Sequence, residues 1–160
     1  MGRPTGRDVQ LRQPADATCR GGHALTTTPS TSTRVALIER YFAACSGGST
    51  DAVARCFTSD ATIYDTNHAP VRGSEAIGTF WAGVHARWGG ASWSVDSAVG
   101  DGDEVAIEWS MRGTHDGEPF TVRGSEHYRF AGELIAEIRQ YWSFDREHPG
   151  SELIDYPYRD

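Results

Sequence analysis

The sequence predicts an α+β domain in which three N-terminal helices pack on a curved, mostly antiparallel sheet and enclose an apolar pocket, giving a cone-shaped fold. Two observations predict this class. Apolar residues recur at helical spacing in the N-terminal half of the chain and at alternate positions in the C-terminal half. The second half also carries turn signals such as Asp116-Gly117, which are typical of hairpins. Helices followed by a run of strands form the α+β arrangement.

Three helices are predicted, over residues 34–46, 50–57 and 74–88. Thr33 is expected to cap the first of them, because a threonine hydroxyl can accept a hydrogen bond from a free N–H of the first turn. Gly89 and Gly90 are expected to end the third helix. Between the last two helices, a strand over residues 61–66 places Asp65 on the same side as two apolar residues.

Four strands are predicted after the helices, over residues 91–99, 105–111, 120–130 and 134–144. In the third of these strands, alternation places Glu126 among apolar and aromatic side chains, whereas the opposite side is uniformly polar. An ionised carboxylate that is buried without a partner is very costly. Glu126 therefore either pairs with an arginine or has a chemical role.

The chain of 160 residues is long enough for one domain with a sizeable core. Its composition divides it into an extension over residues 1–32, a domain over residues 33–145 and a tail over residues 146–160. The extension is expected to be disordered, because it is polar and rich in glycine and proline and has almost no apolar residues to bury. It carries no apolar stretch of the kind found in secretion signals, so a cytoplasmic location is expected.

The charge of the chain argues against several classes of partner. Residues 34–160 carry eleven arginines and twenty acidic residues, a net charge of −9, which is unfavourable for binding phosphate backbones. No apolar run reaches the length that crosses a bilayer. The three cysteines and six histidines lack the spacing of metal ligands, and the glycines do not form a phosphate loop. We therefore expect no metal or cofactor, and neither a nucleic acid nor a membrane as partner.

Three polar residues, Tyr41, Asp65 and Glu126, fall on otherwise apolar faces of their predicted elements. Each has a purely structural interpretation. Tyr41 can be a core tyrosine that bonds to a carbonyl, Asp65 can cap the turn after its strand, and Glu126 can pair with an arginine. Three such groups in one pocket would instead indicate a functional site.

Five segments carry a resemblance to a known family: IERYFAA, DATIYD, RGSEAI, SEHYRF and IRQYWSFD. Together they resemble the SnoaL-like, nuclear-transport-factor-2-like superfamily over residues 34 to about 145. The closest catalytic pattern is that of the bacterial ketosteroid isomerases. This resemblance implies that Asp65 is a general base and that Tyr41 and Glu126 donate hydrogen bonds to an oxyanion. The chain departs from the pattern in carrying Glu126 where the family usually has aspartate, and Tyr64 in place of an acidic residue.

The resemblance implies a cofactor-independent enzyme that transfers a proton on a hydrophobic carbonyl compound, either steroid-like or polyketide-like. It also implies a homodimer formed through the sheet, for which the polar side of the strand over residues 120–130 is available. The residues expected to contact the substrate are His68, Trp81, Trp109, Met111, Tyr128, Gln140 and Trp142.

Two other functions remain open. One is a SnoaL-type cyclase of natural-product biosynthesis that uses the same Asp65 as base, and the other is a non-catalytic ligand-binding or dimerisation domain. The enzyme interpretations require Tyr41, Asp65 and Glu126 to converge on one pocket, whereas binding requires only the pocket. The limonene-epoxide-hydrolase mechanism is unsupported, because Trp109, Met111 and Gln140 stand where that branch carries its charged residues.

Overall fold

The computed structural model describes residues 30–143, 153 and 155–158. Most of the extension predicted over residues 1–32 and much of the tail predicted over residues 146–160 therefore lie outside the described residues. The elements are, in chain order, α1 (Thr31–Ser46), α2 (Thr50–Ala54), β1 (Phe57–Asp65), β2 (Val71–Arg72), α3 (Ser74–Arg87), β3 (Ser92–Asp101), β4 (Glu104–His115), β5 (Glu118–Ala131) and β6 (Leu134–Tyr141).

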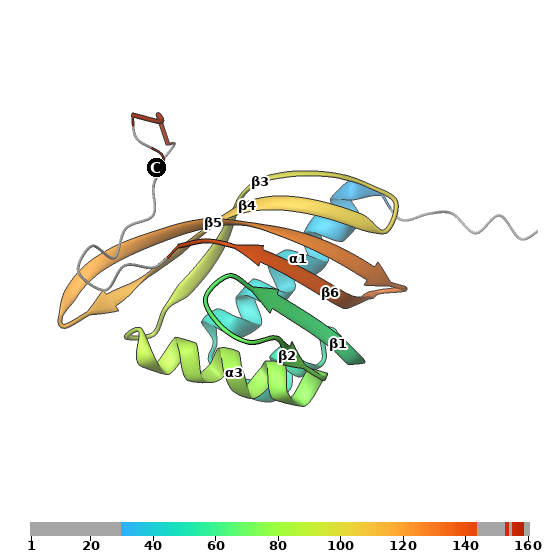
Figure 1. Ribbon diagram of the computed structural model, residues 1–160, viewed down its shortest axis with the longest axis horizontal. Coiled ribbons are helices and arrows are strands. Elements are labelled where there is room, and N and C mark those ends of the chain that lie inside the picture. Colours follow the sequence, from blue (N-terminus) through green and yellow to red (C-terminus); the bar gives the residue numbers. More distant parts are fainter. Residues whose placement is uncertain (1–29, 144–152, 154, 159–160) are drawn as a thin grey trace, which may run out of the picture.

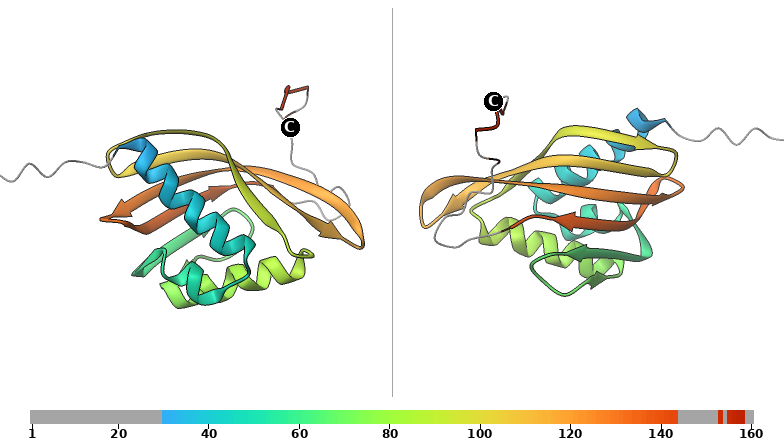
Figure 2. Two further views of the ribbon diagram at one scale, coloured as in Figure 1. Left: turned by 180° about the vertical axis from the view of Figure 1, so that it is seen from behind. Right: turned by 45° about the horizontal axis from the view of Figure 1, so that its top comes forward.

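The six strands form one sheet in the order β2-β1-β6-β5-β4-β3. The pairing of β1 with β6 is parallel and all other pairs are antiparallel. The sheet is strongly curved and arches over α3, while α1 crosses the same face (Figures 1 and 2). The predicted α+β class with a curved, mostly antiparallel sheet is confirmed.

The hairpin turn and the four strands predicted for the second half of the chain are present in the structure. Asp116 and Gly117 both have positive φ, 52° and 87°, and form the two-residue turn between β4 and β5. On one side of β5 the structure buries Val122, Glu126, Tyr128 and Phe130, and on the other side it exposes His127 and Arg129. The alternation therefore assigned the two faces of this strand correctly.

The boundaries differ from the prediction in the first half. Ser30, not Thr33, is the N-cap of α1, and its hydroxyl accepts a hydrogen bond from the Thr33 N–H. The predicted cap was wrong because a second hydroxyl three residues earlier can start the helix one turn sooner. The second helix ends at Ala54, and β1 begins at Phe57. Strand β2 was not predicted, since two residues are too few to show a periodic pattern.

The core lies between the concave face of the sheet and the helices. It contains one unexpected charged residue, Arg34, whose side chain is 1% exposed. The Arg34 guanidinium donates to the Gly132 carbonyl and to the Asp103 carboxylate, and it lies 4.6 Å from the centre of the Phe130 ring. Arg34 thus ties α1 to the turns between β3 and β4 and between β5 and β6.

The outer face of the sheet is partly covered by the chain's own C-terminal residues. Arg123 donates to the Ser110 hydroxyl at 2.7 Å and to the Asp96 carboxylate at 3.2 Å, and its guanidinium lies 3.8 Å from the centre of the Tyr158 ring. Part of the polar face that was expected to meet solvent or a second subunit therefore contacts Tyr158 of the same chain, and the homodimer stays a prediction.

In the part of the chain that the structure describes, no helix is both long and apolar enough to cross a membrane.

Candidate active site

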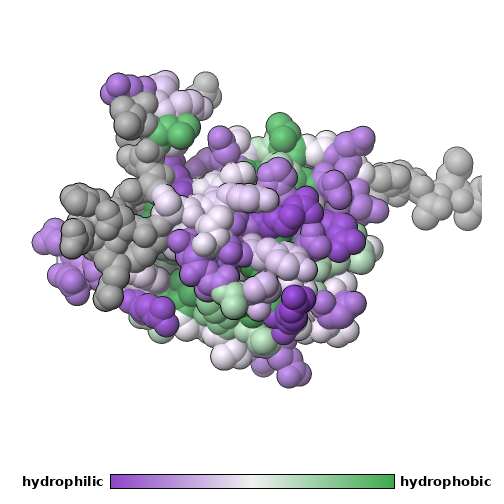
Figure 3. Space-filling view, in the orientation of Figure 1, coloured by the Kyte–Doolittle hydropathy of each residue, from purple (hydrophilic) through white to green (hydrophobic). Residues whose placement is uncertain are grey.

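A cavity of about 1130 Å³ opens between the concave face of the sheet and α3. Its volume is slightly larger than the range of about 300–1,000 Å³ that small-molecule sites usually occupy. All five tryptophans of the chain line it, at positions 81, 88, 93, 109 and 142. Figure 3 shows hydrophobic surface between the sheet and α3, next to a mainly hydrophilic surface over β1 and β6. The cavity therefore suits a large and mostly apolar ligand.

Six of the seven predicted substrate contacts line this cavity, namely His68, Trp81, Trp109, Met111, Gln140 and Trp142. Tyr128 does not. Of the three predicted catalytic residues, Asp65 lines the cavity, whereas Tyr41 and Glu126 are not among the described residues that line it. The structure therefore places the predicted base at the cavity wall and the two predicted donors elsewhere.

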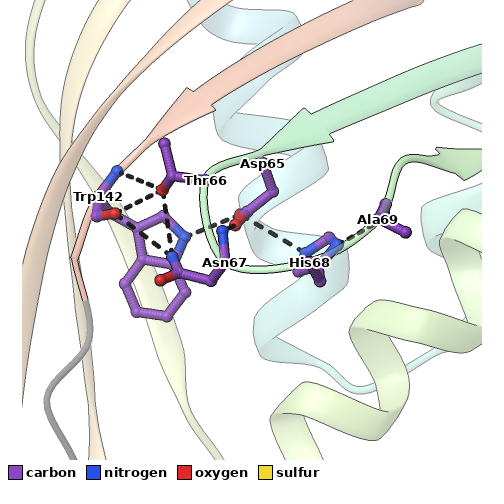
Figure 4. A network of polar contacts seen from close by, with 6 residues as sticks. All are labelled: Asp65, Thr66, Asn67, His68, Ala69 and Trp142. Carbon is purple, nitrogen blue, oxygen red and sulfur yellow. Dashed lines mark hydrogen bonds and ion pairs between the residues drawn. The ribbon is translucent and has the colours of Figure 1, made fainter.

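Asp65 is the last residue of β1, and its carboxylate is fixed by two donors. The backbone N–H of Asn67 donates to Oδ1 at 2.6 Å, and the indole N–H of Trp142 donates to Oδ2 at 2.8 Å (Figure 4). The Asp65 side chain is only 1% exposed. Asp65 thus caps its turn, as the structural interpretation expected, and also presents an oriented carboxylate at the cavity.

His68 faces the same carboxylate from the loop that follows β1. Its Nε2 lies 3.5 Å from Asp65 Oδ2, and its Nδ1 lies 2.8 Å from the Ala69 carbonyl oxygen (Figure 4). The ring also packs on Phe80 of α3, with 4.6 Å between the ring centres. His68 was expected to contact the substrate. In the structure it lines the cavity and also lies beside the Asp65 carboxylate.

Asp65, Gln140 and Glu126 form a row of polar side chains across the neighbouring strands β1, β6 and β5. Gln140 of β6 is in register with Asp65 of β1 on one side and with Glu126 of β5 on the other. In an antiparallel pair such as β5 and β6, residues directly opposite each other have Cβ atoms about 4.5–5.5 Å apart. The row therefore leads from the cavity wall at Asp65 towards the buried Glu126.

Glu126 is 2% exposed and accepts a hydrogen bond from the Tyr128 hydroxyl. The pKa of the Glu126 carboxyl is raised from 4.5 to about 8, chiefly because burial disfavours the charged form; the hydrogen bond from Tyr128 opposes the shift and the charge of Asp65 adds to it. Among the described residues, no arginine forms an ion pair with Glu126. The ion-pair interpretation of Glu126 therefore has no partner among the described residues, and a carboxyl group that stays neutral near pH 7 remains a prediction.

Tyr41 lies behind the cavity wall in an aromatic cluster. Its ring centre is 5.1 Å from that of Phe57, 6.4 Å from that of Trp81 and 6.5 Å from that of Tyr128. Burial raises the pKa of the Tyr41 hydroxyl well above its usual value, with further contributions from Cys45 and Glu126. Trp81 packs on Tyr41 and also lines the cavity, so it lies between the two.

Among the described residues that line the cavity, three buried polar atoms have no hydrogen-bond partner: Nε1 of Trp81, Nε1 of Trp109 and Oε1 of Gln140. Buried polar atoms are almost always paired, so each unpaired one requires an explanation. The cavity wall thus contains two N–H donors and one amide oxygen acceptor that the rest of the described chain does not pair.

Gly124 makes room for one of these indoles. It is opposite Trp109 in the pairing of β4 with β5, and a Cβ atom on Gly124 would lie 2.5 Å from Trp109 Cζ2. Such a contact is far shorter than packed carbon atoms allow. The absence of a side chain at position 124 therefore lets the indole of Trp109 lie across β5.

Several residues of the site were not predicted from the sequence. Phe80 of α3 and Trp88 at its C-terminal end were not predicted as substrate contacts, yet both line the cavity. The role of Trp142 as a donor to Asp65 was also missed, because only the parallel pairing of β1 with β6 brings residues 77 positions apart together. Aromatic residues at helical spacing were the signal for the first group, and the sequence carried no signal for the second.

In the described part of the chain, no group of three or more His, Cys, Asp or Glu side chains is arranged to hold a metal ion.

Comparisons with known proteins agree with this architecture. No curated protein matches the chain in sequence. A hypothetical protein with a ketosteroid isomerase-like fold from Catenulispora acidiphila, solved in complex with trimethylamine, is 28% identical, with a TM-score of 0.62 over 67% of this chain and 85% of the other. A protein of unknown function with a cystatin-like fold from Methylobium petroleophilum is 26% identical, with a TM-score of 0.64 over 82% and 90% of the two chains.

A third structure shares the fold at lower identity. An LEH-like epoxide hydrolase from Mycobacterium tuberculosis is 16% identical, with a TM-score of 0.62 over 72% of this chain and 86% of the other. The model of the SnoaL-like domain matches residues 38–138, which is more than half of the chain. The chain therefore belongs to the SnoaL-like domain family.

Proposed function

We propose that this protein is an enzyme that moves a proton on a hydrophobic carbonyl compound, without a cofactor, and that Asp65 is its general base. The observation that carries the proposal is the carboxylate of Asp65 at the cavity wall, held by the Asn67 N–H and the Trp142 indole. A positioned base of this kind can take a proton from carbon and return it elsewhere on the substrate. The position of the carboxylate is what such a step requires.

The lining of the cavity supports a large, mostly apolar substrate with a few oxygen atoms. Five indoles supply apolar surface, and the unpaired N–H groups of Trp81 and Trp109 can donate to carbonyl or hydroxyl oxygens. The unpaired oxygen of Gln140 can accept from a hydroxyl group. A steroid-like or polyketide-like ketone has this combination of groups.

Tyr41 and Glu126 remain our proposed donors to the oxyanion that forms after proton removal. Two features support this role. Glu126 keeps its proton near pH 7 because burial raises its pKa to about 8, so it can donate a hydrogen bond. A neutral carboxylic acid in an apolar site is also the device by which ketosteroid isomerase stabilises its oxyanion. The substrate would have to reach past Trp81 and Gln140, because Tyr41 and Glu126 lie behind the wall.

A cyclisation reaction is the second candidate. It would use the same Asp65 to activate a carbon acid, and the new bond would form between two carbons of one substrate. The cavity volume of about 1130 Å³, large enough for a folded chain of several rings, favours this candidate.

A substrate panel with a matched pair of variants tests the proposal. The panel contains hydrophobic β,γ-unsaturated ketones and open-chain polyketide-like ketones, and tryptophan fluorescence reports their binding. We expect at least one compound to be converted and Asp65→Asn to lower its turnover about 10²–10⁴-fold while binding persists. Asp60→Asn, at an exposed position of the same strand, serves as the control. Binding without conversion, unchanged in Asp65→Asn, would instead establish a ligand-binding protein.

The product separates the two reactions. A shifted double bond appears as a conjugated enone with strong ultraviolet absorption, whereas ring closure changes the carbon skeleton, which mass spectrometry with fragmentation detects.

A further inference from the structure

The orientation of the His68 ring fixes which of its nitrogens carries a proton. Nδ1 lies 2.8 Å from the carbonyl oxygen of Ala69, and a carbonyl oxygen can only accept a hydrogen bond. Nδ1 must therefore be the protonated nitrogen when the ring is neutral. The lone pair is then on Nε2, which lies 3.5 Å from Asp65 Oδ2 (Figure 4). A proton acceptor thus faces the carboxylate that we propose as the base.

The surroundings of the pair connect His68, but not Asp65, to solvent. The side chain of Asp65 is 1% exposed and that of His68 is 27% exposed. Phe80 packs on the imidazole and the Trp142 indole binds the other side of Asp65 Oδ2, so both partners are held in place. Arg87, His115 and Asp116 line the same cavity, yet among the described residues His68 is the one basic side chain within ion-pair distance of Asp65.

From this geometry we propose that His68 takes up the proton that Asp65 removes from the substrate and exchanges it with solvent. The inference rests on the proposed role of Asp65 as base. In the first step, the substrate C–H bond breaks, its electron pair stays on the substrate, and an O–H bond forms on Asp65 Oδ2. In the second step, this O–H bond breaks and an N–H bond forms on His68 Nε2, giving an imidazolium. The imidazolium then gives the proton to water, and a solvent proton returns by the reverse steps to the new carbon.

The relay predicts where the final proton comes from. A base that is sealed from water returns the same proton that it removed, so the product keeps the hydrogen of the substrate. A base connected to water through His68 instead returns a proton from solvent. The two cases differ in the isotope content of the product even when the rate of conversion is the same.

The tautomer of His68 can be tested without a substrate. In the full-length protein labelled with ¹⁵N, long-range ¹H–¹⁵N spectra recorded at about pH 9 distinguish the two neutral forms of each histidine ring. We expect His68 to carry its proton on Nδ1 and to have an unprotonated Nε2. A proton on Nε2 would overturn the proposal, because no lone pair would then face Asp65.

The relay itself is tested in heavy water with a compound whose conversion depends on Asp65. We expect deuterium at the reprotonated carbon of the product, and we expect His68→Phe to remove most of this deuterium per molecule of product. His115→Phe is a matched control, because His115 also lines the cavity, has Nε2 3.6 Å from a carboxylate oxygen of Asp116 and packs on an aromatic ring, but does not face Asp65.

The outcomes separate the two proposals. Equal deuterium in the wild type and in His68→Phe would reject the relay and leave Asp65 as base. Conversion that is unaffected by Asp65→Asn would reject the base, and the relay with it. Deuterium that falls equally in the His68 and His115 variants would also reject the relay, because the effect would then belong to the cavity as a whole.

Discussion

The indole N–H of Trp142 donates to Oδ2 of Asp65 at 2.8 Å, although 77 positions separate the two residues in sequence. The contact is anchored by the loop after β1, because Thr66 and Asn67 both donate from their side chains to the Trp142 carbonyl oxygen, at 2.5 and 3.3 Å (Figure 4). A carboxylate that is held at both oxygens has one orientation. The proposed base is therefore positioned by the junction of β1 and β6 and not by β1 alone.

Replacing Trp142 by phenylalanine should lower turnover roughly 10- to 100-fold, because a hydrogen bond to a charged group contributes about 1.5–3 kcal/mol. The phenyl ring keeps most of the apolar contact but cannot donate to Asp65. Steady-state kinetics on a converted compound measure the change. Trp93→Phe is the control, since Trp93 lines the same cavity and forms no hydrogen bond with Asp65 in the structure. Equal losses in the two variants would show that the indole acts only through its bulk.

The free energy of unfolding should depend on pH, because Glu126 has a different pKa in the folded and the unfolded protein. Its pKa is raised from 4.5 to about 8 in the folded state, so from about pH 4.5 upwards the unfolded chain loses this proton while the folded protein keeps it. The free energy of unfolding then falls as pH rises, by at most about 1.4 kcal/mol per pH unit, until the folded pKa is reached. The stabilisation is fully present below the unfolded pKa and is lost as pH rises through the folded pKa.

Urea unfolding at pH 5.5 and pH 7.5 measures this effect. The wild type should lose more stability between the two values than Glu126→Gln, which has no proton to lose. Glu118→Gln, at an exposed position of the same strand, should follow the wild type. Parallel behaviour of the wild type and Glu126→Gln would mean that the carboxyl group is already ionised at pH 5.5.

The bond between Tyr128 and Glu126 changes the expected effect of removing the carboxyl group. Glu126→Leu removes a buried polar group but leaves the Tyr128 hydroxyl buried without its partner, which costs about 1–3 kcal/mol. Adding Tyr128→Phe removes the orphaned hydroxyl, so the double variant should be more stable than Glu126→Leu alone. Thermal unfolding of the two single variants and the double variant forms a complete cycle. Strictly additive losses would contradict a direct bond between the two side chains.

Asp103 should matter for stability although its side chain is 59% exposed. It is the counter-ion of Arg34, whose guanidinium is buried and would keep its charge. We expect Asp103→Asn to destabilise the protein by more than the about 0.5 kcal/mol that is typical of surface positions. Chemical denaturation is the measurement, and Asp101→Asn, an exposed residue of the same hairpin, is the control. A loss of stability no larger than that of the control would show that the Gly132 carbonyl and the Phe130 ring are sufficient partners for the Arg34 guanidinium.

The sequence predicted the class of the fold because its two periodicities are local properties. Alternation placed Glu126 on the buried side of β5, and apolar residues at helical spacing predicted a helix over residues 74–88, where α3 lies. The Asp116-Gly117 pair predicted a hairpin turn because few other residues adopt positive φ easily. Helix and strand ends were less predictable, as Ser30 and Phe57 show, because several residues near each end can serve as cap or first strand residue.

By itself, the sequence determined that Asp65 and Glu126 lie on otherwise apolar faces of their strands, since this follows from which side of a strand a residue occupies. Only the tertiary structure decided their neighbours. The parallel pairing of β1 with β6 brings Trp142 to Asp65 and puts Gln140 between Asp65 and Glu126, and the loop after β1 turns His68 back onto Asp65. Such contacts depend on strand order and register, which are set by the packing of the whole sheet and not by any local pattern.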